Sequence, residues 1–265
     1  MDQPLPSDRP VPRSRLARLL AAGRAGAGAG WGWVDERRAQ AAVVVGALLV
    51  VAGVAGFLGV LDAVRERDDL AAVDRPVLAW LVDARSDALS AVMAGVSAVT
   101  GPVVLPVLVV VASVVWGLVA KGWWQAGLLA GGMILSTVVS VTLKSWVARP
   151  RPPVDTMYVP GSETTYSFPS GHTIGTATFL LVVAYLLWVR RPTVRGLVVA
   201  LPLVVLGVAV VALSRLYLGY HFVTDVVAST ALAVSVLGVV VVVDRRRAAR
   251  AAVAVAPRLT GDRSR

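Results

Sequence analysis

Long runs of apolar residues without a charge constrain the fold of this chain more than any other feature of its sequence. An α-helix needs about 20 apolar residues to cross the hydrocarbon core of a bilayer, and several runs reach that length. Charged residues make up only 16% of the 265 residues, whereas a soluble domain has about a quarter. The sequence therefore predicts an all-α integral membrane protein. It contains no cysteine, which excludes disulfide scaffolds and thiolate metal sites.

We predict six transmembrane helices, at residues 41–61, 88–120, 123–143, 173–189, 197–213 and 223–243. The second of these runs is too long for one untilted crossing and too short for two crossings with a turn. Gly101-Pro102 and Pro106 interrupt it, and proline disrupts a helix interior. We interpret it as one long, kinked span. Two spans at this place would instead reverse the orientation of everything that follows.

The segments outside these runs divide the chain into three parts. Residues 1–38 are rich in Pro, Arg, Ala and Gly, which is typical of a flexible basic tail. Residues 39–244 form the six-span domain, and residues 245–265 form a second basic tail. Between the first two spans, residues 62–87 carry apolar side chains near helical spacing. This pattern predicts an amphipathic helix that lies at the membrane interface.

The distribution of positive charge predicts the orientation. The net charge of +10 comes from 26 Lys and Arg against 16 Asp and Glu. In so apolar a chain this charge favours the cytoplasmic membrane surface over a nucleic-acid partner. Six crossings that start inside place most of the basic residues on the cytoplasmic side. We therefore expect a multi-pass protein of the cytoplasmic membrane with both termini cytoplasmic. The oligomeric state does not follow from the sequence.

Rare polar residues stand at the ends of the predicted spans. The two histidines are His172 and His221, and Lys144 and Arg215 occupy equivalent places. Because successive spans alternate in direction, all four residues fall on one face of the membrane, which is the outer face in this orientation. A single cation at a bilayer edge is often only an anchor. Four such residues together indicate a functional site.

Two local patterns suggest how this site is built. In KSWVARPRP, the prolines hold Lys144 and Arg151 at and beyond the end of a helix. In YSFPSGHT, Ser170 is a favourable N-cap and Gly171 allows a tight turn into the next helix. A helix N-terminus preceded by such residues binds anions. His172 stands within this turn.

A third pattern, SRLYLGYHFVTD, places Asp225 four residues after His221. At this spacing a carboxylate can reach the imidazole and orient it, which leaves the other ring nitrogen free as a nucleophile or base. A His–Asp pair at a membrane edge could also serve a proton relay or a metal site. One carboxylate and two histidines beside three cations are a poor metal site, however, and favour a pocket for an anionic phosphate.

Together, the three segments resemble the signature motifs of the type 2 phosphatidic acid phosphatase family, the lipid branch of the acid phosphatase and vanadium haloperoxidase superfamily. Every defining position of the three motifs matches. These positions are Lys144 with Arg151-Pro152, then Pro169-Ser170-Gly171-His172, and finally Ser214-Arg215 with His221 and Asp225.

The resemblance implies hydrolysis of a lipid phosphate monoester or pyrophosphate, such as phosphatidic acid, phosphatidylglycerol phosphate or a polyprenyl pyrophosphate, without metal or cofactor. It implies that His221 attacks phosphorus, that Asp225 orients His221, and that His172 serves as acid and then as base. The residues implied to hold the phosphate oxygens are Lys144, Arg151, Ser170, Gly171 and Arg215.

Two other functions stay open. One is a lipid-linked phosphotransferase that uses the same site, and the other is a non-enzymatic transporter. A transporter would carry ionisable residues deep in its spans, and these spans are almost wholly Ala, Val, Leu and Gly. The loop at residues 153–168 and the segment at 62–87 are the candidates for lipid selectivity. Within that loop we interpret Asp155 and Glu163 as solvated residues.

Overall fold

Helices form all the regular secondary structure in the described part of the chain. The computed structural model describes residues 15–261, with side chains at 37 and from 39 to 251 except 69. The elements are α1 (Arg15–Glu66), the 3₁₀ helix η1 (Asp69–Val73), α2 (Asp74–Asp83), α3 (Asp87–Val99), α4 (Val104–Val119), α5 (Trp123–Val147), the 3₁₀ helix η2 (Val154–Thr156), α6 (Gly171–Arg190), α7 (Val194–Tyr217) and α8 (Val223–Gly261). The predicted all-α fold is confirmed.

Among the described residues, five helices are long and apolar enough to cross a membrane, and a bent pair of shorter helices passes the same test together. The five are the Ala39–Glu66 part of α1, then α5, α6, α7 and the Val223–Ala251 part of α8. Counting the bent pair as one span makes six, as the sequence predicted. The chain is a multi-pass membrane protein.

The bent pair replaces the single kinked span predicted at residues 88–120. α3 and α4 are separate helices that meet at an angle of 51°. Gly101 and Pro102 lie in the break. Proline has no N–H to donate and disfavours a helical conformation in the residue before it. The kink is therefore a complete interruption of the helix.

The two terminal helices are longer than the sequence predicted. α1 is helical from Arg15, where a flexible tail was expected up to residue 38, and α8 continues to Gly261 through the second expected tail. Residues 1–14 lie outside the described part. Both extensions contain many Ala and Arg residues, which favour a helix. They also prolong an existing helix, which needs no new nucleus.

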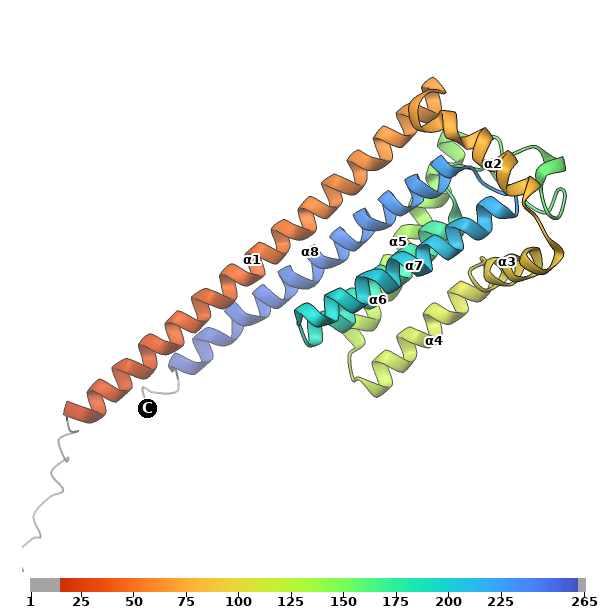
Figure 1. Ribbon diagram of the computed structural model, residues 1–265. Helices are drawn as coiled ribbons and strands as arrows, with labels where there is room; N and C mark the ends of the chain where they lie inside the picture. Colours follow the sequence, from red (N-terminus) through yellow and green to blue (C-terminus); the bar gives the residue numbers. More distant parts are fainter. Residues whose placement is uncertain (1–14, 262–265) are drawn as a thin grey trace, which may run out of the picture.

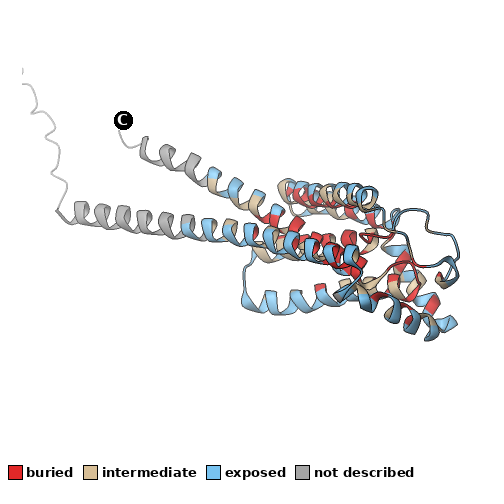
Figure 2. Ribbon diagram, turned by 90° about the horizontal axis from the view of Figure 1, so that it is seen from above, coloured by how far each residue is buried: buried red, intermediate tan, exposed pale blue. Residues whose placement is uncertain are grey.

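The membrane-spanning parts of α1 and α8 run side by side (Figure 1). Small residues allow this close approach, as in many membrane helix pairs. A Cβ atom at Gly53 would lie 2.4 Å from the Ala231 oxygen, and one at Gly238 would lie 2.5 Å from the Gly46 oxygen. Figure 2 shows that α4, in contrast, is exposed along most of its surface.

A short helix closes one end of the bundle between α1 and α3 (Figure 1). This is α2, which lies in the segment where an interfacial amphipathic helix was predicted. Leu78 and Leu81 are buried on one side of it, while Trp80 is 67% exposed on the other. The helix therefore has the expected apolar and exposed faces.

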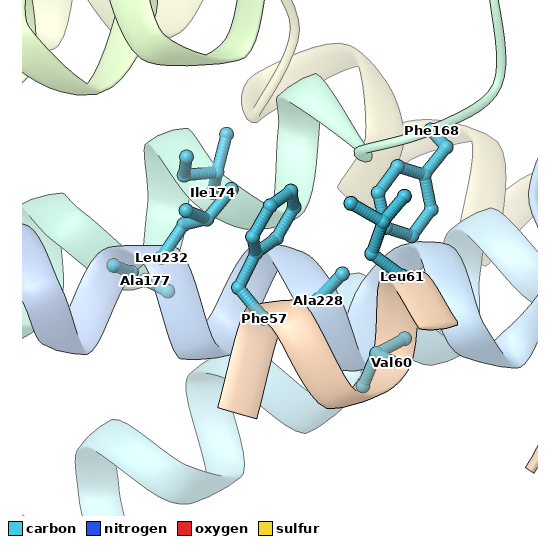
Figure 3. Packing of buried hydrophobic residues seen from close by; sticks show 9 residues of the cluster. Phe57, Val60, Leu61, Phe168, Ile174, Ala177, Ala228 and Leu232 are labelled. Atoms are coloured by element: carbon cyan, nitrogen blue, oxygen red, sulfur yellow. The ribbon is translucent and has the colours of Figure 1, made fainter. Parts of the chain in front are cut away.

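An apolar cluster lies directly below the PSGH turn and holds it in place (Figure 3). Phe57 and Leu61 of α1 pack there with Ile174 of α6 and Ala228 of α8. Phe168, which is completely buried, joins the cluster with its ring centroid 5.7 Å from that of Phe57. Burial of this aromatic residue fixes the chain just before the turn.

Candidate active site

Four helix ends meet at the end of the bundle that α2 covers. They are the C-terminal ends of α5 and α7 and the N-terminal ends of α6 and α8. The Ser170 amide donates to the Asp225 carbonyl oxygen at 3.4 Å, and the Ser229 hydroxyl donates to the Ser170 carbonyl oxygen at 3.0 Å. Arg151 of the first segment donates to the Tyr220 carbonyl oxygen at 2.8 Å. The three predicted motif segments therefore lie together in space.

A sharp turn between α7 and α8 presents His221. Gly219 adopts a φ of 74°, and a Cβ atom there would lie 2.1 Å from the Thr156 oxygen, so this position favours glycine. His221 Nδ1 lies 3.2 Å from Asp225 Oδ2. The same oxygen also accepts hydrogen bonds from the Ser167 hydroxyl and, at 2.9 Å, from the Phe222 amide. The predicted His–Asp contact is confirmed.

The partners of His221 define its tautomer. Arg151 Nη1 lies 3.2 Å from Nε2, and a guanidinium can only donate. Nε2 must therefore carry the lone pair, and Nδ1 carries the hydrogen that faces Asp225. Burial, aided by Arg215 and Arg151 and opposed by Asp225, lowers the pKa of His221 to about 3. The imidazole is thus neutral at pH 7, with an unprotonated nitrogen beside Arg151.

A carboxylate joins two of the predicted phosphate-binding cations. Glu163 Oε2 lies 2.9 Å from Arg151 Nη2, and Glu163 Oε1 pairs with Arg215 Nη2. Burial opposes its ionisation, but Arg215 and Arg151 lower the pKa of Glu163 below its usual value. The interpretation of Glu163 as a solvated residue is wrong, whereas Asp155 is exposed as expected. The two guanidinium groups thus form an anion site next to His221.

Arg215 is the most deeply buried cation of the site, with 1% of its surface exposed. Its Nη1 donates to the Ser97 hydroxyl of α3, and its Cζ lies 4.5 Å from the centroid of the Tyr220 ring. Its Nε has no hydrogen-bond partner among the described residues. A buried donor without a partner is costly. This donor is therefore available to a further acceptor.

The PSGH turn forms as predicted. Ser170 caps α6, because its hydroxyl oxygen accepts from the Thr173 amide and, at 3.0 Å, from the Thr173 hydroxyl. Lys144 lies beside Gly171 and donates through Nζ to the Tyr166 carbonyl oxygen. His172, in the first turn of α6, interacts electrostatically with Glu163 and the cations of the site. A Cβ atom on Gly101, in the break between α3 and α4, would lie 3.5 Å from its Nε2.

Comparison with known families finds a match for the part of the chain that carries the site. A model of the PAP2 superfamily matches residues 125–249. That range contains all eight residues predicted for the site. This part of the chain therefore resembles the PAP2 superfamily.

Individual PAP2 proteins are similar over more of the chain. Phosphatidylglycerophosphatase B of Bacillus subtilis (strain 168) is 28% identical over 178 residues, which are 66% of this chain and 85% of that protein. The crystal structure of a transmembrane PAP2-type phosphatidylglycerolphosphate phosphatase from Bacillus subtilis matches with a TM-score of 0.65 and 27% identity. It covers 74% of this chain and 96% of its own. Aquifex aeolicus LpxE, at 19% identity, matches with a TM-score of 0.48 over 64% of this chain and 94% of its own.

Sequence reasoning missed a group of residues that surround the motif residue Asp225. Ser167, Thr224, Arg149 and Asp74 form hydrogen bonds or ion pairs to Asp225 or to one another. Arg149 had a visible signal, because RPRP contains two Arg–Pro pairs and the motif uses only the second. Asp74 had none, since it lies in a different part of the chain among other acidic residues.

Within the described part of the chain, no group of three or more His, Asp or Glu side chains is placed to hold a metal ion. The groups around the anion site are the cations Arg151, Arg215 and Lys144 and the imidazoles of the two histidines. This set of cations and imidazoles suits a phosphoryl group in its chemistry.

Proposed function

We propose that the protein hydrolyses a phosphate monoester or pyrophosphate of a membrane lipid through a phosphohistidine intermediate and without a metal ion. The match to the PAP2 superfamily model and the similarity to phosphatidylglycerol phosphate phosphatases of Bacillus subtilis support a lipid phosphatase. One observation carries the mechanism. Two guanidinium groups converge on one carboxylate beside the unprotonated Nε2 of His221.

In the first step, the lone pair of His221 Nε2 attacks phosphorus in line with the leaving oxygen. The P–N bond forms as the P–O bond to the lipid breaks. The imidazole then carries a positive charge, which the ionised Asp225 beside Nδ1 balances. The protonated form of His172, which the second step regenerates, donates a proton to the leaving oxygen, an assistance worth about 10²–10⁴ in rate.

In the second step, His172 takes a proton from water and the oxygen of that water attacks phosphorus. The P–N bond breaks, which releases inorganic phosphate and restores His221. Lys144, Arg151 and Arg215 balance the charge on the phosphoryl oxygens throughout, in the role that metal ions have in many phosphoryl transfers. The Ser170 hydroxyl and the Gly171 amide at the start of α6 supply further donors.

The relatives suggest where to look first for the substrate. Phosphatidylglycerol phosphate heads the candidates, followed by phosphatidic acid and polyprenyl pyrophosphates such as undecaprenyl pyrophosphate. We place the protein in the cytoplasmic membrane, with both termini inside and the site on the outer face. The excess of Lys and Arg on the inside supports this orientation.

Phosphate release from a panel of lipid phosphates, by detergent-purified protein in EDTA, tests the function. We expect release that survives EDTA and that His221→Ala reduces to background. His172→Ala should slow release by about 10²–10⁴, and less for substrates with a good leaving group. Normal turnover by folded His221→Ala protein would contradict the mechanism, and loss of activity in EDTA would contradict metal independence.

The same assay separates hydrolysis from phosphate transfer. With labelled substrate and an added alcohol or lipid acceptor, a phosphatase releases inorganic phosphate, whereas a transferase labels the acceptor. If the folded protein releases phosphate from none of the lipids, phosphate acceptors and transported ligands are the next candidates to test.

A further inference from the structure

We propose that Arg149 and Asp74 are positioning residues that hold the Asp225 carboxylate, and through it His221, in the geometry for attack. This inference rests on the proposed phosphatase function. It also gives the short helix α2 a part in catalysis, because Asp74 is its first residue.

Arg149 is held by contacts on both sides of its guanidinium group. Nη1 lies 2.5 Å from Asp225 Oδ1 and 2.7 Å from the Thr224 hydroxyl, and Nη2 lies 2.7 Å from Asp74 Oδ2. Its Cζ also lies 4.5 Å from the centroid of the Phe222 ring. The rigid, planar arrangement of its donors suits such a bridge between two carboxylates.

The two oxygens of Asp225 have separate partners. Oδ1 is held by Arg149, while Oδ2 accepts from Ser167 and from the Phe222 amide and faces His221 Nδ1. The side chain of Asp225 is completely buried. Without Arg149, Oδ1 would lack its ion pair, and the carboxylate could rotate away from the imidazole. The tautomer of His221 and the orientation of its ring would then be less well defined.

Asp74 secures the other end of this chain of contacts. Only 3% of its side chain is exposed. Its Oδ1 accepts from the Thr224 amide at 3.0 Å, and its Oδ2 accepts from the Thr224 hydroxyl at 2.6 Å. Asp74 thus fixes both Arg149 and the first turn of α8, which carries Asp225. The link joins segments 150 residues apart in the sequence.

Arg149 and Arg151 have different places although they are two residues apart. Arg151 lies at Nε2 of His221 and pairs with Glu163 in the anion site. Arg149 lies on the other side of the His221–Asp225 pair, in contact with Asp225 and Asp74. A change at Arg149 should therefore act on the chemical step and leave substrate binding nearly unchanged.

Steady-state kinetics of variants in the full-length protein test the proposal. We expect Arg149→Met and Asp74→Asn to lower kcat by about 10- to 100-fold, the usual range for residues that orient a reacting group, with KM within about twofold. Arg149→Lys should recover part of the loss. The double variant Asp74→Asn/Arg149→Met should be no slower than Arg149→Met alone, because coupled residues do not add.

Matched controls lie on the same helix. Arg75→Met and Asp83→Asn alter exposed charges on α2 and should leave kcat unchanged. Tryptophan fluorescence establishes that each variant is folded. If Arg149→Met does not fold, Arg149→Lys and the isosteric Thr224→Val decide the matter by the same criterion.

Two results would overturn the positioning role. One is a kcat within twofold of the parent in the folded variants, and the other is a raised KM with unchanged kcat, which would make Arg149 a lipid-binding residue. Phosphate release by the parent protein distinguishes failure of the proposed function from failure of the positioning role. If it releases no phosphate from any lipid, the proposed function fails; if it does so while these variants behave like the controls, only the positioning role fails.

Discussion

His221 stands among cations and yet must supply an electron pair. Burial removes the solvation that would stabilise an imidazolium, and Arg215 and Arg151 disfavour a further positive charge. Asp225 acts in the opposite direction. The balance keeps the ring neutral before attack and provides a carboxylate partner when the ring becomes charged.

Histidine NMR can test the charge state of His221 directly, since the protein has only two histidines. We expect its ring signals to remain those of a neutral imidazole from pH 8 down to pH 5, because its pKa is lowered to about 3. A lowered pKa delays protonation, so any acid loss of activity through this group falls below pH 5. The His221→Ala spectrum identifies the signals. A midpoint near 6.5 would contradict the prediction.

Glu163 occupies the position in which a phosphate would meet Arg151 and Arg215. We expect Glu163→Gln to bind inorganic phosphate about tenfold more tightly, because a neutral amide competes less for the two guanidinium groups and repels the anion less. Product inhibition or calorimetry measures this affinity. Asp155→Asn, in the same loop and exposed, is the matched control and should have no effect. Unchanged or weaker phosphate binding in Glu163→Gln would show that the carboxylate does not compete for the site.

At the scale of elements, helix ends and helix breaks build the site. The interruption between α3 and α4 places Gly101 against His172, and Ser97 at the end of α3 accepts from Arg215. A continuous helix would satisfy its own backbone and could not turn at this point. The break is thus the feature that lets the second span contribute residues to the site.

The close contact of α1 with α8 gives a test of packing. Gly53→Ala should destabilise the protein by about 1–3 kcal/mol, the usual effect of overpacking, because its Cβ would lie 2.2 Å from the Ser235 hydroxyl oxygen. Gly59→Ala on the same helix has no neighbour within 4 Å and should be neutral or slightly stabilising. Thermal unfolding in detergent measures both. Equal melting temperatures for the two variants would contradict this account of the contact.

At the scale of the whole molecule, all the motif residues gather at one end of the bundle, so the orientation in the membrane determines which compartment the site serves. The absence of cysteine makes this orientation easy to measure. We expect Ser162→Cys, in the loop over the site, to react with a membrane-impermeant maleimide in intact cells. Pro192→Cys, between α6 and α7, should react only after lysis. The reverse pattern would place the site on the cytoplasmic side.

Local features of the fold and site could be predicted from the sequence. Apolar runs of membrane-spanning length require helices, because a backbone in lipid must satisfy its own hydrogen bonds. The four-residue spacing of His221 and Asp225 and the N-cap at Ser170 follow from the geometry of a single helix turn. These features depend on residues close together in the chain, which is why composition and spacing were sufficient.

Contacts between distant segments came only from the packed bundle. Glu163 meets Arg215 across 52 residues, and Arg149 meets Asp225 across 76. Spacing alone did not indicate that Arg149 would contact Asp225 while Arg151 lies at Nε2 of His221. The depth and rotation of each helix set these contacts, and both arise from packing against neighbouring helices. Side chains that form a site across such distances become visible only when the helices are placed together.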